Sequence, residues 1–247
     1  MTDNTAAYPL IQLSGLDGLV VTFADSFSES ANRAALSLRA EIEAQGWPGV
    51  AETATSLLSC SLRLDPDLAT PDAVTERLND LLGSRDWLDQ PLPQGRRLLT
   101  IPACFHPDLA PQIDEAAETA GFKDRDAAIA SIAGADLRVL TIGFAPGQPY
   151  IGQLPADWDL PRQRKLTPKV PVGALGLAIR QLVLFAVDTQ TGWRHVGQTA
   201  MRLFQPMADD PFLLRPGDSL RFDPCPPADI ARLWDDPLGG ARIEVSA

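Results

Sequence analysis

Proline and glycine cut the second half of the chain into short apolar runs, and this pattern limits the folds open to it. The chain of 247 residues has 22 prolines and 18 glycines, and most of them lie in this half. Apolar runs of strand length bounded by turn residues are typical of β structure. The expected strands here are 137–144, 175–177, 181–187, 195–199, 219–222 and 242–245. Many short strands with such turns predict a sandwich or a barrel.

The first part of the chain alternates strands and helices instead. Residues 58–65 alternate apolar and polar side chains, which indicates a strand buried on one face. Residues 71–82 begin with proline directly after Thr70, an N-cap residue, and predict a helix. A strand at 18–23 and a helix that ends near Gly46 precede them. Strand, helix, strand and helix in about 85 residues are typical of a compact α+β unit.

A polar, turn-rich stretch from residue 86 to 95 separates these two patterns. It contains Pro91, Pro93 and Gly95, and we place a domain boundary at its start. The sequence therefore predicts a small α+β N-terminal domain at residues 1–85 and a mainly-β domain at residues 86–247. In the second domain a strand at 97–105 and helices at 113–121, 124–133 and 227–234 accompany the strands named above.

Charge and cysteine content exclude several classes of protein. The formal net charge of -11 disfavours a nucleic acid as partner. No apolar run approaches the ~20 residues that a membrane helix needs, and the N-terminus lacks the features of a secretory signal. Cys60, Cys104 and Cys225 lie far apart, and their odd number disfavours a disulfide framework. We expect a cytoplasmic chain without membrane or nucleic-acid partners.

Motifs for chemistry are sparse. The two histidines, His106 and His195, have no metal-ligand spacing with other side chains, and we interpret His195 as a structural or surface residue. The sequence has no phosphate-binding glycine loop and no nucleophile elbow, so it predicts neither a catalytic residue nor a metal site. The exception is the turn around Gly147. Its flanking prolines and glycine could present free N–H groups to a carboxylate or amide, although a plain structural turn is the alternative.

Several stretches with a characteristic order and spacing of proline and glycine carry a family resemblance. They read GFAPGQPYIG at 143–152, TPKVPVGALGLA at 167–178, GW at 192–193, VGQT at 196–199 and LRPGDSLRF at 214–222. With these the chain resembles the family of the 5-oxoprolinase B subunit. This family is also described as a carboxyltransferase domain, as allophanate hydrolase subunit 1 and as an inhibitor of a sporulation histidine kinase. The resemblance covers nearly the whole chain and is weaker before residue 86.

The resemblance implies a cyclophilin-like β-barrel for the second domain and an ATP-dependent complex that opens 5-oxoproline to glutamate. It implies as partners a second barrel subunit, of the 5-oxoprolinase C type, and a subunit of the A type, in a hetero-oligomer that binds a small acid or lactam. ATP is implied by the complex and by no motif of this chain. Departures from the family pattern at Ile132, Gln148 and Gln153 favour the alternative, a non-catalytic regulatory protein. A third alternative, prolyl isomerisation, is suggested by the barrel alone.

On this basis we expect a ligand between the turn 146–150 and the strand that begins at Gln181. Gln181 would hydrogen-bond a lactam or carboxyl group, and basic side chains nearby would pair with a carboxylate. Backbone N–H groups near Gly147 and Gly173 would polarise a carbonyl. The expected ligand-binding residues are Pro146, Gly147, Pro149, Tyr150, Arg162, Lys169, Gly173, Arg180 and Gln181.

Overall fold

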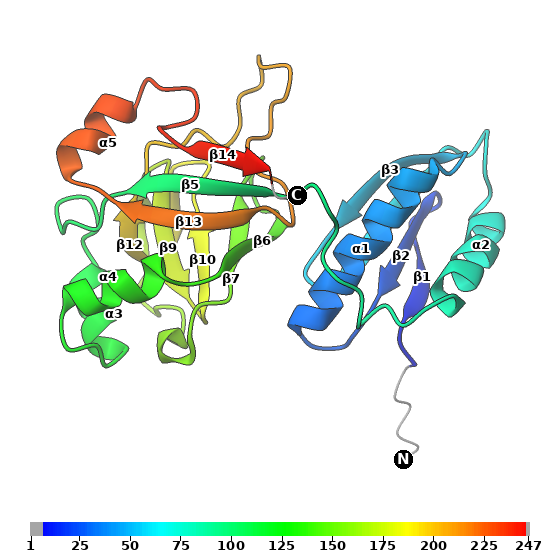
Figure 1. Ribbon diagram of the computed structural model, residues 1–247, viewed down its shortest axis with the longest axis horizontal. Helices are drawn as coiled ribbons and strands as arrows, with labels where there is room; N and C mark the ends of the chain where they lie inside the picture. Colours follow the sequence, from blue (N-terminus) through cyan, green and yellow to red (C-terminus); the bar gives the residue numbers. More distant parts are fainter. Residues whose placement is uncertain (1–6, 246–247) are drawn as a thin grey trace. The chain divides into compact units, whose positions relative to one another are not determined.

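The computed structural model describes residues 7–245, and the chain divides into two compact units (Figure 1). The first unit ends at Gln94 and the second begins at Gly95, whereas the sequence placed the boundary between residues 85 and 86. The segment 86–94 belongs to the first unit because Trp87 is buried in its core, 6.5 Å from the ring of Phe23. Burying a side chain as large as Trp87 ties the segment to that core.

An antiparallel sheet and two helices make up the first unit. The strand order is β1-β2-β4-β3, and both helices pack against strands of this sheet. The bounds are β1 (Leu10–Ser14), β2 (Gly18–Thr22), α1 (Glu29–Gln45), β3 (Val50–Thr55), β4 (Ser59–Leu64) and α2 (Pro71–Gly83). In β4, Cys60, Leu62 and Leu64 are buried, so the expected alternation is realised in the structure.

Local sequence signals fix both ends of α1 and the start of α2. The Ser28 side chain accepts a hydrogen bond from the N–H of Ala31 at the start of α1, and Gly46 ends the helix with a φ of 58°. Thr70 accepts a hydrogen bond from the N–H of Ala73 at the start of α2. Capping side chains satisfy N–H groups that have no partner inside the helix, and glycine adopts the left-handed conformation with little strain.

An eight-stranded sheet dominates the second unit, in the order β12-β9-β10-β7-β6-β13-β5-β14 (Figure 1). Its strands are β5 (Arg97–Ala103), β6 (Leu137–Ile142), β7 (Pro149–Gly152), β9 (Ala174–Ala178), β10 (Gln181–Leu184), β12 (Arg194–Gln198), β13 (Ser219–Pro224) and β14 (Arg242–Val245). β13 runs parallel to β5, and the other neighbouring pairs are antiparallel. Most of the buried apolar side chains of these strands pack into one core together with the fully buried Trp158, and a smaller separate cluster contains Val183, Phe185 and Trp193.

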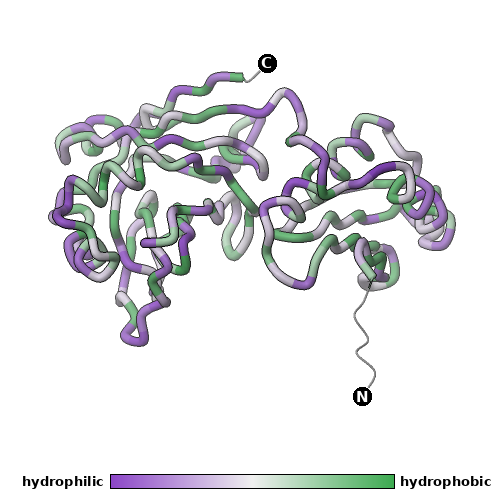
Figure 2. The backbone as a smooth tube through the Cα atoms, turned by 60° about the horizontal axis from the view of Figure 1, so that its bottom comes forward, coloured by the Kyte–Doolittle hydropathy of each residue, from purple (hydrophilic) through white to green (hydrophobic). Residues whose placement is uncertain are grey.

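Helices and a two-stranded ribbon complete the second unit. They are α3 (Ile113–Thr119), α4 (Arg125–Ala133), η1 (Ala156–Trp158), α5 (Pro227–Leu233) and the ribbon strands β8 (Thr167–Val170) and β11 (Thr189–Thr191). Ile113 of α3 and Ile132 of α4 are fully buried in the core, so these helices cover an apolar part of the sheet. Apolar segments run through both units in Figure 2, because each unit has a core of its own.

Residues at two distant points of the strand order are joined directly. The N–H of Cys104, just after β5, donates to the carbonyl of Gln198 in β12 at 2.8 Å, and the N–H of Gln198 donates back at 2.9 Å. We call this pair of bonds the seam. The fold is a mixed α/β arrangement with several sheets, in which the seam brings β5 beside β12.

Five strands that the sequence did not predict are present, namely β1, β3, β7, β8 and β11. β3 and the ribbon strands are mostly polar and accessible, so their sequences lack the apolar alternation of a half-buried strand. Among residues 7–245, no helix is both long enough and apolar enough to cross a bilayer.

Candidate functional site

The turn around Gly147 is held by close backbone packing. Gly147 has a φ of 73°, and a Cβ at this position would lie 2.7 Å from the carbonyl oxygen of Leu203. Gly173 has a φ of 79°, and its Cβ would lie 2.4 Å from the carbonyl oxygen of Thr199. Only glycine fits such positions, so both residues serve local packing. The exposed Pro146 stands in the same turn.

Pro149 and Tyr150 belong to β7 and not to the turn. Pro149 is the first residue of the strand and lies opposite Ile142 of β6, a position where proline interrupts no ladder. Tyr150 lies opposite Val183 of β10. The expected turn therefore ends two residues earlier, at Gln148, whose buried side chain accepts a hydrogen bond from the N–H of Ala186 at 3.3 Å.

Gln181 and Arg180 lie at the other end of β7. Gln181 is opposite Gly152, three residues along the strand from Pro149, which corresponds to about 10 Å. The guanidinium of Arg180 donates to the carbonyl of Leu154 at 3.0 Å. The structure thus does not bring Gln181 and Arg180 to the turn, and Arg180 is engaged with this chain's own backbone.

Lys169 is also engaged, in the ribbon. Its ammonium group lies 2.7 Å from the carboxylate of Asp188. This hydrogen bond, together with one from the N–H of Val172, lowers the pKa of the Asp188 carboxyl below its ordinary value. Lys169 remains largely exposed, so the pair lies at the surface.

Tyr150 and Arg162 do meet, at Trp193. The rings of Tyr150 and Trp193 are 6.1 Å apart and nearly edge-on, and the Arg162 guanidinium carbon lies 6.0 Å from the Trp193 ring. Cation–π attraction extends to about 6 Å from the ring centroid, so the indole ring attracts the Arg162 guanidinium only weakly. Gly176 makes the packing possible, because a Cβ there would lie 2.7 Å from the ring of Phe185.

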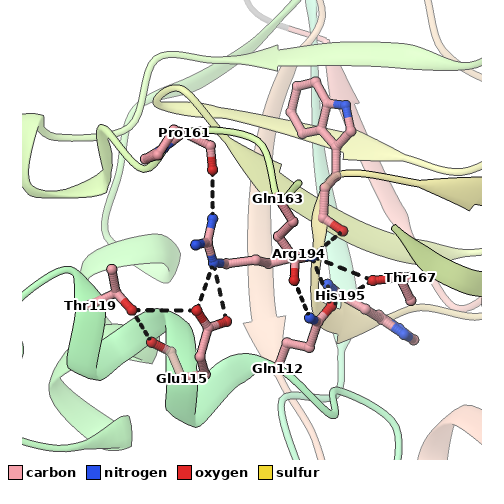
Figure 3. A network of polar contacts seen from close by, with 9 residues as sticks. Gln112, Glu115, Thr119, Pro161, Gln163, Thr167, Arg194 and His195 are labelled. Carbon is pink, nitrogen blue, oxygen red and sulfur yellow. Dashed lines mark hydrogen bonds and ion pairs between the residues drawn. The ribbon is translucent and has the colours of Figure 1, made fainter. Parts of the chain in front are cut away.

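A network of polar side chains adjoins Trp193, the residue before β12 (Figure 3). The side-chain oxygen of Gln112 accepts hydrogen bonds from the His195 N–H at 2.8 Å and from the Thr167 hydroxyl at 3.1 Å. The side-chain amide of Gln112 donates to Gln163 at 2.8 Å, and that of Gln163 donates to the Trp193 carbonyl at 3.3 Å. The network ties the helical region, the ribbon and β12 to one another.

Arg194 brings a charge into this network. Its side chain is 9% exposed, and its Nε lies 3.1 Å from both carboxylate oxygens of Glu115 on α3. A second guanidinium nitrogen donates to the carbonyl of Pro161 at 2.8 Å (Figure 3). A buried guanidinium is tolerated only when it is paired in this way.

His195 is the member of this network with an unsatisfied nitrogen atom in its side chain. It is 6% exposed, and in the described part of the chain its buried Nε2 has no hydrogen-bond partner. Burial lowers the pKa of its imidazole, and contacts with Gly197 and Gln198 oppose that effect. A neutral imidazole can donate or accept one hydrogen bond at Nε2. His195 is therefore buried, as a structural residue can be, and does not lie at the surface.

We call the set formed by Tyr150, Arg162, Gln163, Trp193, Arg194 and His195 the Trp193 site. Sequence reasoning found Tyr150 and Arg162 and missed the other members, together with Gln112 and Glu115. The signal in the sequence was the segment 194–198, where Arg, His and Gln occur within or directly before a predicted strand. All five of these residues are buried in the structure. Within residues 7–245, no group of three or more His, Cys, Asp or Glu side chains could hold a metal ion.

The chain is similar to proteins of a known family. Residues 9–214 match the family described as "Carboxyltransferase domain, subdomain C and D". The 5-oxoprolinase B subunit of Bacillus subtilis (strain 168) is 27% identical over 232 residues, which cover 88% of this chain and 93% of that protein. The protein of the same name from Escherichia coli O157:H7 is 31% identical over 179 residues, which cover 72% of this chain and 79% of that protein.

A solved structure agrees with these matches. The crystal structure of TTHA0988 has a TM-score of 0.70 and 25% sequence identity to this chain. The likeness covers 88% of this chain, which spans 40% of the length of TTHA0988. The chain belongs to the carboxyltransferase domain C and D family, as a divergent member of its group of 5-oxoprolinase B subunits.

Proposed function

We propose that this chain is one component of a multi-subunit complex that opens the ring of 5-oxoproline, or of a similar small lactam acid, with ATP. The proposal is supported by family membership and by the shared name of the relatives from Bacillus subtilis and Escherichia coli. A five-membered lactam is a stable amide, so its hydrolysis requires activation of the carbonyl oxygen. Phosphorylation by ATP supplies such activation.

The Trp193 site is the part of the chain where we place the ligand. Tyr150 is half-buried and packs edge-on against the buried Trp193, so its remaining ring surface can contact a flat five-membered ring. The exposed Arg162 lies beside them and can pair with a carboxylate. The observation that carries the placement is the meeting of Tyr150 and Arg162 at Trp193, since these two expected ligand-binding residues come from separate segments.

The residues at the other expected positions do not fit a nucleotide. The chain has no phosphate-binding glycine loop, and Lys169 is paired with Asp188. We therefore assign ATP to another component of the complex, together with most of the catalytic groups. The partners in this proposal are a second barrel protein of the C type and a subunit of the A type, in a cytoplasmic hetero-oligomer.

The second unit is, in this proposal, a cyclophilin-like barrel. The seam between Cys104 and Gln198 supports it, because it links the β12 end of the strand order back to β5. Joining β12 back to β5 protects the β12 edge from pairing with other chains. The ligand would then lie on the outside of the barrel wall.

The test is turnover by the assembled complex. The chain is co-expressed with the products of its neighbouring genes, and ATP-dependent release of glutamate from 5-oxoproline is measured. Arg162→Gln removes the proposed carboxylate partner, and we expect KM to rise at least tenfold, since a charge-assisted hydrogen bond contributes roughly 1.5–3 kcal/mol. Arg164→Gln is the matched control on the same exposed segment, with unchanged KM. A folded complex without turnover would refute the enzymatic proposal.

A non-catalytic binding role is the second candidate, and one observation favours it. Polar side chains at two expected ligand positions are engaged within the chain, since Arg180 donates to the Leu154 carbonyl and Lys169 is paired with Asp188. A regulatory protein needs a shaped surface and no free catalytic groups. This role predicts that the purified chain binds a partner protein tightly, and that Arg162→Gln leaves the activity of the partner unchanged.

A further inference from the structure

Two cysteines that are distant in the sequence are neighbours on parallel strands. In the ladder between β13 and β5, Pro224 is the last registered residue and lies opposite Ala103. The ladder continues by one bond, in which the N–H of Cys225 donates to the carbonyl of Ala103 at 3.0 Å. The same register places Cys225 opposite Cys104.

The two thiols also share one environment. Cys104 and Cys225 belong to one small apolar cluster with Ala200 of the loop after β12 and with Ile230 and Leu233 of α5. Equivalent residues on neighbouring strands point to the same face of a sheet. Such strands are separated by about 4.8 Å, and a disulfide requires Cα atoms roughly 4.4–6.8 Å apart, so the pair lies within reach of a covalent bond.

The two sulfurs differ in their access to solvent. Cys104 is fully buried, whereas Cys225 is partly exposed. Burial, followed by the charge interaction with the adjacent Cys104 thiol, raises the pKa of Cys225 to about 11. The third cysteine, Cys60, is buried in the core of the first unit, and burial raises its pKa to about 12.

We propose that Cys104 and Cys225 form a redox-active pair, which a low-molecular-weight disulfide of the glutathione type converts into an intramolecular disulfide. The Cys225 thiolate attacks one sulfur of the oxidant and releases one thiol molecule. The Cys104 thiolate then attacks Sγ of Cys225, forms the Sγ–Sγ bond and releases the second thiol. The protein loses two electrons, the oxidant's disulfide gains them, and the two cysteine protons end on the released thiols.

The position of this bond gives it a structural effect. It would join β5 to β13 directly beside the seam, where Cys104 also pairs with Gln198. In a reducing compartment the pair stays a dithiol, and an oxidising shift closes it. Because only the thiolate attacks and the pKa of Cys225 lies near 11, the rate should rise about tenfold from pH 7 to pH 8.

The test uses the full-length chain incubated with oxidised glutathione at pH 8, followed by thiol titration in denaturant and non-reducing peptide mapping. Of the three cysteines, one should remain titratable, with a linked peptide pair that contains residues 104 and 225. The melting temperature should rise by roughly 10 °C and return with dithiothreitol, because the bond closes a long loop.

Variants separate the possible outcomes. Cys104→Ala should stop at a glutathione adduct on Cys225, and Cys225→Ser should keep its thiols free. Three free thiols after oxidation of the unmodified chain, or a stable glutathione adduct on its Cys225, would overturn the proposal. A link that includes Cys60 would overturn it as well. These results do not depend on the substrate of the complex, because they are measured on this chain alone.

Discussion

Replacing Gly176 by alanine tests the packing that supports the Trp193 site. Gly176 is buried in the middle of β9, with β10 on one side and β12 on the other. A Cβ at this position would lie 2.7 Å from Cε2 of Phe185 and 3.0 Å from Cβ of Trp193. Phe185 is 3% exposed and Trp193 is 7% exposed, so neither ring can turn into solvent to relieve the clash.

The expected cost follows from overpacking. Inserting a methyl group into a well-packed core costs about 1–3 kcal/mol of unfolding free energy. For a unit of about 150 residues, each kcal/mol lowers the melting temperature by about 2–4 °C, so the Gly176→Ala variant should lose roughly 2–12 °C. Calorimetry measures this loss, and tryptophan fluorescence should report the displacement of Trp193.

Gly143→Ala is the matched control in the same unit. Among the described residues, no heavy atom apart from its chain neighbours lies within 4 Å of a Cβ at Gly143, so the change should stay within about 0.5 kcal/mol of the unmodified chain. If the Gly176→Ala variant is as stable as this control, Phe185 and Trp193 do not pack against Gly176 as described. The proposed placement of the ligand would then lose its structural basis.

Three further predictions concern the polar network and a helix cap. Glu115→Gln should cost about 1–2 kcal/mol of unfolding free energy, because it leaves the buried Arg194 guanidinium without its carboxylate partner. The cost stays moderate because Glu115 itself is half-exposed. Chemical denaturation measures this cost, and the control Glu118→Gln should change the stability little. Burial lowers the pKa of His195, so below about pH 6.5 the unfolded chain binds more protons than the folded chain, and the stability should drop as the pH falls. His195→Gln should make the stability less dependent on pH, which thermal melts between about pH 5 and 7.5 measure. Thr70→Ala should cost about 1 kcal/mol of first-unit stability in urea unfolding, because an N–H of α2 loses its capping acceptor.

The expected elements of the fold came from patterns that depend on neighbouring residues alone. Alternating side chains predicted β4, because one face of a strand meets the core and the other meets solvent. Thr70, Pro71 and Gly46 predicted helix ends, because capping satisfies backbone groups within one turn. The polar ribbon strands gave no such signal, because they become strands only by pairing with each other.

Only part of the candidate site could be predicted from the sequence. The motif at 143–152 marked a stiff turn, but β-sheet register decides where its neighbours lie, and register placed Gln181 opposite Gly152 instead of the turn. The charged and polar residues at 194–198 were visible in the sequence. Their burial depends on α3 and the segment 161–167, which are distant along the chain.

The sequence by itself determined the mixed α/β class, the family, the end of α1 and the start of α2, because these depend on local periodicity and on the order of motifs. The tertiary structure alone decided that Tyr150 and Arg162 meet at Trp193 and that Cys104 faces Cys225. Strand order and register place Tyr150, Cys104 and Cys225, whereas Arg162 reaches Trp193 from a segment outside the strands. Backbone hydrogen bonds between remote segments fix that order, and side-chain type along one segment does not encode it.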